Sequence, residues 1–182
     1  MDRRKGRHDR PLRRPSGLFA MVNGFLSIAL MSLAALVTQQ PLVFPSLGPT
    51  AFLLFSTPRQ AVASPRNALC GHFIGIVTGY LSLVVFGLQN VGPALQEGVT
   101  VGRVGAAALS LGLCAGLMVW LRVPHPPAGS TTLIVSLGAL TTLDQMAMLM
   151  LAVFLLLVQG WSINRLAGID YPLWRAHSSR RP

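Results

Sequence analysis

Long uncharged stretches dominate the hydrophobic pattern of this chain. Asp, Glu, Lys and Arg are absent from five of them, at residues 15–58, 67–96, 104–121, 123–143 and 145–164. A helix crosses the hydrocarbon core of a bilayer with about 20 mostly apolar residues. The pattern therefore predicts an all-α membrane protein, and the five stretches have room for four to six crossings.

Four segments are predicted to be full transmembrane helices, at about residues 18–38, 66–88, 103–121 and 143–164. Ser64-Pro65 predicts the start of the second, because serine caps helix N-termini and proline suits the first helical turn. Thr142 followed by Asp144 predicts the start of the last one. Residues 89–102, with Gly92-Pro93 as a turn signal, are expected to form a loop.

Two breaks divide the pattern, at residues 39–49 and 123–129, and both are too rich in proline and glycine to continue a helix. A short apolar piece follows each break, too short to span the hydrocarbon core as helix alone. The breaks align as P-x-x-G-x-T, at residues 45–50 and 126–131, 81 positions apart. We therefore expect two broken or half-helix segments and a duplicated repeat, with halves at about 17–88 and 103–164.

The number of crossings depends on whether each break, with its short apolar piece, crosses the membrane or returns to the side on which it entered. If they do, four helices cross and the basic residues divide 12 inside to 3 outside. Seven extended residues reach about 23 Å, so a break plus its half-helix is long enough to cross the membrane. In that case six segments cross, and 14 of the 15 basic residues lie inside. Both divisions obey the positive-inside rule, and six crossings obey it better. Three crossings per half would make the halves inverted repeats, as in many transporters.

The charge of the chain follows the same rule. The net charge is +10, but seven of the fifteen basic residues lie in the first fourteen positions and four follow Asn164. This distribution is typical of cytoplasmic membrane flanks and excludes nucleic-acid binding as a main function. We expect a disordered basic cytoplasmic tail at 1–16, a transmembrane domain at 17–164, a basic cytoplasmic tail at 165–182, and a multi-pass location in a bacterial inner membrane.

Helix packing and the membrane surface account for other patterns. Gly71, Gly75 and Gly79 form one small-residue stripe, and Ala108, Gly112 and Gly116 form another. Such stripes let membrane helices approach closely, within a protomer or between protomers, and we expect a homo-oligomer. Aromatic side chains near the end of the last helix suit an interfacial belt in the lipid bilayer; they are Trp161, Tyr171 and Trp174.

Enzymatic chemistry has no sequence support. Cys70 and Cys114 stand alone in apolar helices without metal-ligand spacing. The chain lacks G-x-S-x-G, H-E-x-x-H and paired carboxylates at membrane depth. We expect no enzyme, no metal and no cofactor.

An anion site is the strongest functional prediction. With six crossings, half-helix N-termini near Gly48 and Gly129 would converge at the midplane from opposite sides, and helix N-termini offer partial positive charge and unpaired N–H groups. Broken backbone at this depth is tolerated only where it is buried or lines a polar cavity. Hydroxyls at the half-helix starts would cap the helices, line a pore or both; they belong to Ser46, Thr50, Ser130, Thr131 and Thr132.

Three further polar side chains are candidates for the same site. His125 is either a donor to the anion and a proton relay, or a loop histidine at headgroup level. His72 is expected to make a hydrogen bond inside the bundle or to lie at the interface, ahead of a ligand role. Arg66, with Arg59, is an interfacial anchor or part of a vestibule that attracts anions.

The ordered motifs P-S-L-G at 45–48, S-P-R-N at 64–67, G-H at 71–72 and H-P-P-A-G at 125–129 resemble the HPP family of integral membrane proteins. The resemblance covers about residues 18–164 and implies four transmembrane regions with the signature segments between them. It also implies transport of a small anion, because some plant plastid and cyanobacterial members are associated with nitrite. Pro49 departs from the family, which often has a small residue there.

The sequence therefore favours a channel or secondary transporter for a small inorganic, monovalent anion, with nitrite as the first candidate and both termini cytoplasmic. A protonated His125 would also be able to pass its proton to nitrite. Two alternatives stay open: a non-transporting membrane scaffold or subunit, and a permease for another small solute.

Overall fold

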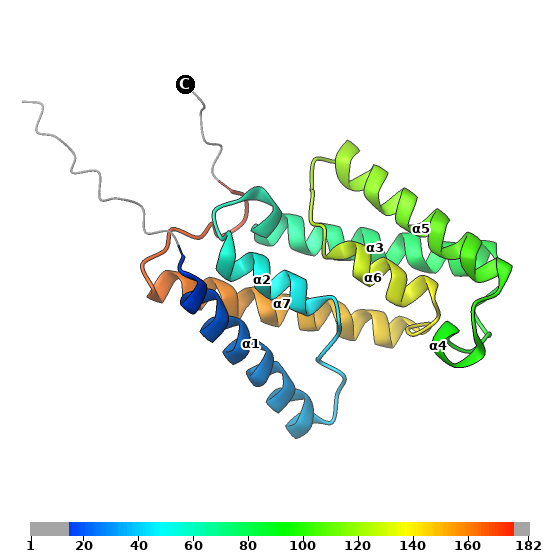
Figure 1. Cartoon of the computed structure of the whole chain (residues 1–182), viewed down its shortest axis with the longest axis horizontal. Coiled ribbons are helices and arrows are strands. Elements are labelled where there is room, and N and C mark those ends of the chain that lie inside the picture. The colour runs from blue at the N-terminus through cyan, green and yellow to red at the C-terminus, as the bar shows by residue number, and fades with distance from the viewer. Residues whose placement is uncertain (1–14, 177–182) are drawn as a thin grey trace, which may run out of the picture.

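The computed structural model describes residues 15–176, which form helices and connecting segments without any strand. The elements in order are α1 (Gly17–Thr38), α2 (Leu47–Ser56), the 3₁₀ turn η1 (Ala61–Ala63), α3 (Pro65–Val85), α4 (Ala94–Glu97), α5 (Val101–Trp120), α6 (Ala128–Ser136) and α7 (Leu143–Leu166) (Figure 1). Helices α1, α3, α5 and α7 are long and apolar enough to cross a membrane. The predicted class, an all-α membrane protein with four full helices and two short ones at the breaks, is confirmed.

The chain reverses direction at each break. In Figure 1, α1 runs from left to right, α2 returns to the left and α3 runs right again. In the other half, α5 runs left, α6 runs right and α7 runs left, so the two halves follow opposite paths. This is the course expected for three crossings per half, and the inverted-repeat relation itself stays a prediction.

Side-chain caps fix the helix starts that the sequence predicted. The Ser64 hydroxyl accepts a hydrogen bond from the Asn67 amide at 3.4 Å, with Pro65 in the first turn of α3. Thr142 and Gln145 form a reciprocal capping box at the start of α7. Each cap satisfies amides that the first helical turn leaves without an intrahelical partner.

Helix α6 ends at Ser136, although the apolar sequence continues to Leu140. Gly138 follows with φ of 82°, a left-handed conformation that favours glycine and stops the helix. Arg103 then reaches this end and donates to the Ser136 carbonyl at 3.2 Å. The loop before α5 also contains the short helix α4, which the sequence pattern did not predict.

Arg103 is buried, although six crossings make it the one basic residue on the outer side. Besides Ser136, its guanidinium donates to the carbonyls of Val91 at 3.0 Å and Gly92 at 2.7 Å. A cation near a helix C-terminus is favourable because the last carbonyls carry partial negative charge. Arg103 therefore ties the α3–α5 connection to the end of α6.

The first glycine stripe packs α3 against α6 within the chain. A Cβ atom on Gly75 would lie 2.8 Å from the Ala128 carbonyl oxygen, and one on Gly79 would lie 2.8 Å from the Val135 Cβ. The α3 backbone thus needs glycine at these positions to approach the short helix. The second stripe differs, because a Cβ on Gly112 would meet nothing within 4 Å. Oligomer formation stays a prediction.

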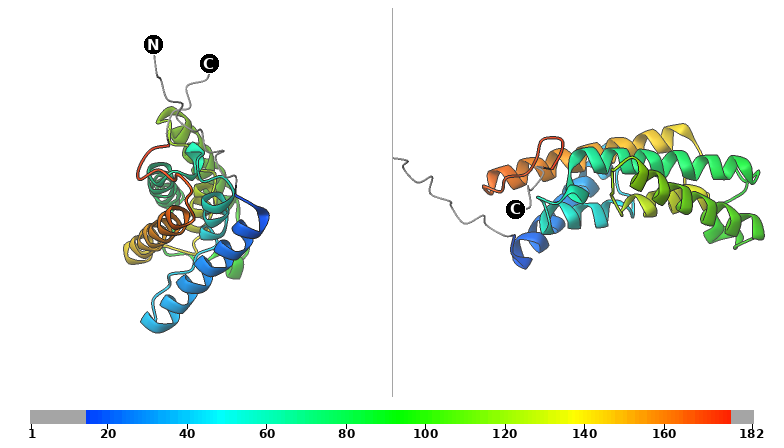
Figure 2. Two further views of the ribbon diagram at one scale, coloured as in Figure 1. Left: turned by 90° about the vertical axis from the view of Figure 1, so that its left-hand side faces the viewer. Right: turned by 90° about the horizontal axis from the view of Figure 1, so that it is seen from above.

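Apolar side chains cover the outer surface of the bundle, as a lipid-facing surface requires. Helix α1 packs obliquely at one edge (Figure 2) and exposes Met21, Phe25 and Leu33. The core between α1, α2, α3 and α7 is apolar as well and includes Phe55 and Leu156.

The segment after α7 folds back onto the start of α3. Tyr171 is buried and its hydroxyl donates to the Ala63 carbonyl at 2.7 Å, while the Trp174 carbonyl accepts from the Arg66 amide at 3.1 Å. Burial raises the pKa of the Tyr171 hydroxyl, which keeps this donor protonated. The Tyr171 side chain is therefore packed inside the protein, and its place in an interfacial belt stays a prediction. The N-terminal tail predicted at 1–16 lies outside the described residues except for its last two positions.

We predict that Gly75→Ala lowers the melting temperature of the detergent-purified protein. The added methyl would meet a backbone carbonyl, and such overpacking costs about 1–3 kcal/mol. Gly112→Ala is the matched control, because its methyl enters open space and alanine favours helix. Equal melting temperatures for the two variants would contradict the packing described here.

We also predict that single cysteines at Gln60 and Gln96, in a chain whose Cys70 and Cys114 are replaced by alanine, are labelled from opposite sides. Both glutamines are exposed. With six crossings, an impermeant maleimide added to intact cells labels position 96 and not position 60. The reverse pattern would show that the breaks are re-entrant.

Candidate functional site

A buried cluster of two histidines and two threonines joins the short helices through α3. Thr50 lies in the first turn of α2, and Thr131 lies in the first turn of α6. His72 comes from the second turn of α3, and His125 comes from the break before α6. All four side chains are fully buried. We call these four residues the histidine–threonine cluster.

His72 connects the two short helices directly. Its Nε2 lies 3.0 Å from the Thr50 hydroxyl, and its Nδ1 lies 2.7 Å from the Thr131 hydroxyl. These threonines occupy the same position in the P-x-x-G-x-T match between the two breaks. The repeated motif therefore supplies one hydroxyl to each side of a single imidazole ring.

His125 completes the cluster. Its Nε2 lies 3.2 Å from the Thr50 hydroxyl, and its Nδ1 donates to the Val62 carbonyl at 2.7 Å. The two imidazole rings are 5.0 Å apart between centroids and meet edge to face. The Thr50 hydroxyl is also 3.0 Å from the Ser46 carbonyl, one turn back in its own segment.

The S-P-R-N and G-H motifs position His125. Arg66 donates to the Arg122 carbonyl and Asn67 donates to the Pro124 carbonyl, both at 3.3 Å, so the start of α3 holds the second break. A Cβ atom on Gly71 would lie 2.8 Å from the His125 Cβ. Glycine at position 71 is therefore what lets His125 lie against α3, beside His72.

The start of α6 differs from the prediction of unpaired amides, which is wrong for this helix. The amides of Ala128, Gly129 and Ser130 donate to carbonyls three residues earlier, at 3.0, 3.0 and 3.1 Å. The H-P-P turn curls tightly into the helix and so satisfies amides that an abrupt helix start would leave free. The partial positive charge of the helix end persists, but the site's donors are side chains.

The other predicted site residues lie around the cluster. Thr132 donates to the Ala128 carbonyl at 2.9 Å within its own helix, and Arg66 reaches the break backbone instead of the cluster. The Ser46 hydroxyl is buried without a hydrogen-bond partner among the described residues. Gly129 and Ser130 are half-buried, while Gly48 is exposed. The binding role of each residue stays a prediction.

Sequence reasoning gave His72 too little weight. The expected hydrogen bond inside the bundle is confirmed, but the pattern alone did not show that His72 links both half-helices. The available signal was the repeated threonine, because hydroxyls at equivalent positions of a repeated motif can bind one shared partner.

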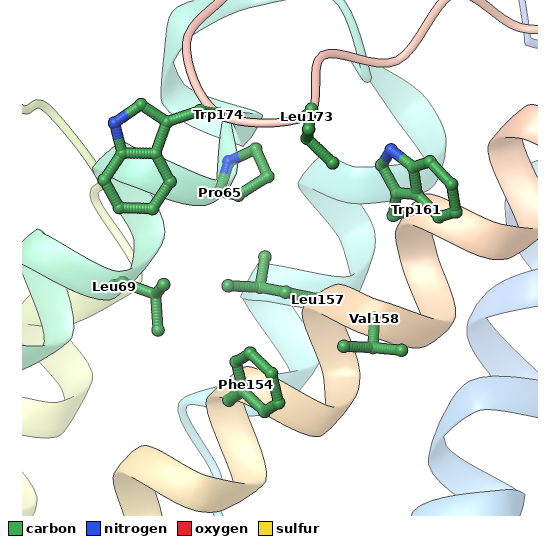
Figure 3. A pocket seen from close by; sticks show the side chains of 8 residues that line it. All are labelled: Pro65, Leu69, Phe154, Leu157, Val158, Trp161, Leu173 and Trp174. Atoms are coloured by element: carbon green, nitrogen blue, oxygen red, sulfur yellow. The ribbon is translucent and has the colours of Figure 1, made fainter.

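An apolar cavity lies away from the cluster. A cavity of about 240 Å³ opens between α3, α7 and the C-terminal segment, lined by apolar side chains such as Phe154, Trp161 and Trp174 (Figure 3). None of the cluster residues lines it, and its apolar walls suit an acyl chain better than an anion. Among the described residues, no group of three or more His, Cys, Asp or Glu side chains is placed to hold a metal ion.

The segment that contains the motifs of this cluster matches a known protein family. The sequence model of one protein family, described as "HPP, transmembrane region", matches residues 10–172 of this chain. The chain belongs to the HPP family. The family resemblance carried by the P-S-L-G, S-P-R-N, G-H and H-P-P-A-G motifs is thereby confirmed.

Two transmembrane proteins of Dictyostelium discoideum are similar to this HPP chain. One is 31% identical over 120 residues, which cover 65% of this chain and 39% of the relative. The other is 29% identical over 117 residues, covering 64% of this chain and 34% of the relative. The matches thus cover between a third and two fifths of these relatives' lengths. No solved structure matches this chain.

We predict that Thr131→Val destabilises the protein more than Thr78→Val does, by about 1–3 kcal/mol. Both substitutions remove a buried hydroxyl and keep the shape, but only the first leaves a buried imidazole nitrogen unpaired. Thermal unfolding in detergent measures the difference. Equal stabilities would mean that the His72–Thr131 hydrogen bond contributes nothing.

Proposed function

We propose that this HPP protein is a permease for a small monovalent anion, with nitrite as the first candidate, and not an enzyme or a passive scaffold. The observation that carries the proposal is the buried cluster in which the first turns of two short helices meet at one histidine. Polar and ionisable residues at membrane depth are rare, and they mark substrate and ion paths.

A scaffold needs only part of this arrangement, such as the pairing of the Val62 carbonyl by His125. Each side chain of the cluster loses its hydration on burial, and apolar residues of similar size would pack the same space without that cost. The chain instead keeps imidazoles and hydroxyls there and uses three glycines to bring the helices close to them. We infer that the polar groups are retained for a ligand.

The charge around the cluster favours an anion. The positive ends of α2 and α6 both face this region, and neither helix carries an acidic side chain. Among the residues of α1, α3, α5 and α7, the one carboxylate is Asp144, in the first turn of α7. A cation path would need acidic groups that these helices do not supply.

The donors suit a small ion. The two histidines and two threonines offer N–H and O–H groups within a few ångströms, and the buried Ser46 hydroxyl adds one without a described partner. Such a site replaces part of the hydration shell of an ion such as nitrite, nitrate or formate. Because the cluster is closed to solvent, passage requires the short helices to separate locally. We place the anion between their first turns, near the midplane.

The orientation of the chain in the membrane is part of the same proposal. The start of α1 and the end of α7 lie at the same end of the molecule (Figure 1). With the positive-inside rule, both termini are cytoplasmic, and a bacterial inner membrane is the proposed location.

We predict that proteoliposomes containing the purified protein take up nitrite, and that His125→Ala lowers the rate at least about tenfold. Losing a donor to a charged ligand costs about 1.5–3 kcal/mol, which is the basis of this figure. Ser110→Ala is the matched control, because this buried hydroxyl bonds within its own helix and leaves uptake unchanged.

Chloride, nitrate and formate serve as competitors in the same assay and define selectivity. If His125→Ala transports like the wild type, the permease stands without a role for this histidine. If folded, inserted protein moves none of these anions, transport of another solute or a scaffold role becomes the better hypothesis.

A further inference from the structure

The histidine–threonine cluster makes one more hydrogen bond than its neutral groups have hydrogens to give. Five contacts connect it: Thr131 to His72, His72 to Thr50, Thr50 to His125, Thr50 to the Ser46 carbonyl and His125 to the Val62 carbonyl. Each full-strength hydrogen bond needs a hydrogen of its own, because one hydrogen shared between two acceptors gives each of them a weaker bond. Two hydroxyls and two neutral imidazoles supply four. One contact therefore lacks a hydrogen while the cluster is neutral.

The carbonyls determine which contact that is. A carbonyl only accepts, so His125 keeps its hydrogen on Nδ1 for Val62, and its Nε2 is then an acceptor. The single hydroxyl hydrogen of Thr50 is consequently claimed twice, by the Ser46 carbonyl at 3.0 Å and by His125 Nε2 at 3.2 Å. While the cluster is neutral these two acceptors share one hydrogen, so at least one of the two hydrogen bonds is weakened or lost.

One added proton resolves the conflict. Placed on His125 Nε2, it donates to the Thr50 oxygen, and the Thr50 hydrogen turns to the Ser46 carbonyl. His72 donates from Nε2 to Thr50 and accepts from Thr131 at Nδ1. All five contacts are then satisfied, and the Thr50 oxygen accepts two hydrogen bonds and donates one.

No carboxylate belongs to the cluster as a counter-ion for that proton. Helices α1, α2 and α6 carry no ionisable side chain within their bounds. The ionisable groups on the other segments around the cluster are Arg59, Arg66, Cys70, Tyr80, Arg103, Cys114, Arg122, Asp144, Arg165, Asp170, Tyr171 and Arg175. Both carboxylates among them lie outside the cluster: Asp144 is in the first turn of α7, and Asp170 is exposed beside Arg165.

A buried imidazolium without a negative partner is strongly unfavourable, and the positive ends of two helices make it more so. A monovalent anion between the same helix ends would neutralise it. Proton and anion then favour each other's binding, and this coupling is reciprocal.

We infer that the cluster binds one proton with each monovalent anion, so that the proposed permease is an electroneutral proton–anion symporter. The Thr50 hydroxyl changes its hydrogen-bond partner when the proton binds. This inference rests on the proposed function and adds its coupling ion. The proton comes from water on the entry side to His125 Nε2 and returns to water on the exit side. No covalent bond of the anion forms or breaks.

Proton uptake on binding is the first test. Nitrate is added to detergent-purified protein in weak buffer, and a pH indicator records protons taken up while equilibrium dialysis records bound nitrate. The wild type takes up close to one proton per nitrate. Thr50→Val takes up none, because without the hydroxyl neither imidazole Nε2 has a partner within the cluster.

Two further variants separate coupling from folding. Thr50→Ser returns the hydroxyl and restores uptake relative to Thr50→Val. Thr78→Val removes a buried hydroxyl that bonds only within α3, and it behaves like the wild type. A wild type that binds nitrate without taking up a proton overturns the inference, whatever the variants do.

Flux in liposomes distinguishes the two proposals. With the membrane potential set by potassium and valinomycin, an electroneutral symporter carries nitrate at a rate independent of potential and acidifies the interior. Nitrate is preferred here because its strong acid does not leak across as a neutral molecule. Voltage-driven nitrate flux without acidification keeps the permease and overturns the symport. Absence of any anion flux overturns both.

Discussion

Unpaired backbone groups are costly at membrane depth, and side chains from distant segments pair such groups around the second break. Asn67 pairs the Pro124 carbonyl of that break, and His125, which belongs to it, pairs the Val62 carbonyl between α2 and α3. At the far end of the second short helix, Arg103 pairs the Ser136 carbonyl. The family motifs are therefore first of all a set of donors for broken backbone. Their spacing follows from where the carbonyls lie.

Close packing turns those donors into a site. The glycine face of α3 brings the backbone of α6 near enough for Thr131 to reach His72, while α2 brings Thr50 to the opposite nitrogen of the same ring. A repeated threonine thus becomes a pair of hydroxyls on one imidazole. Structural and functional roles are inseparable here, because the groups that hold the short helices together are also those that an anion would contact.

The sequence predicted the features that depend on composition and local chemistry. Hydropathy located α1, α3, α5 and α7, and proline with glycine located both breaks. Features that depend on distant partners were missed: Arg103 pairs the last carbonyl of α6 from another helix, and the Tyr171 hydroxyl pairs a carbonyl 108 positions away. His72 belongs to the same class, since its two partners come from different halves of the chain. Hydrogen bonds between remote segments leave no periodic trace in a sequence.

The paired amides at the start of α6 bear on how tightly an anion can be held. A helix end with free amides binds anions strongly, but here the break carbonyls already occupy those donors. The remaining donors are side chains engaged with one another, so an incoming anion exchanges existing hydrogen bonds and gains little net energy. Weak binding suits a permease, which has to release its ion as readily as it accepts it. A protein built to retain an anion would leave the amides of α6 free, and this chain closes them with its H-P-P turn.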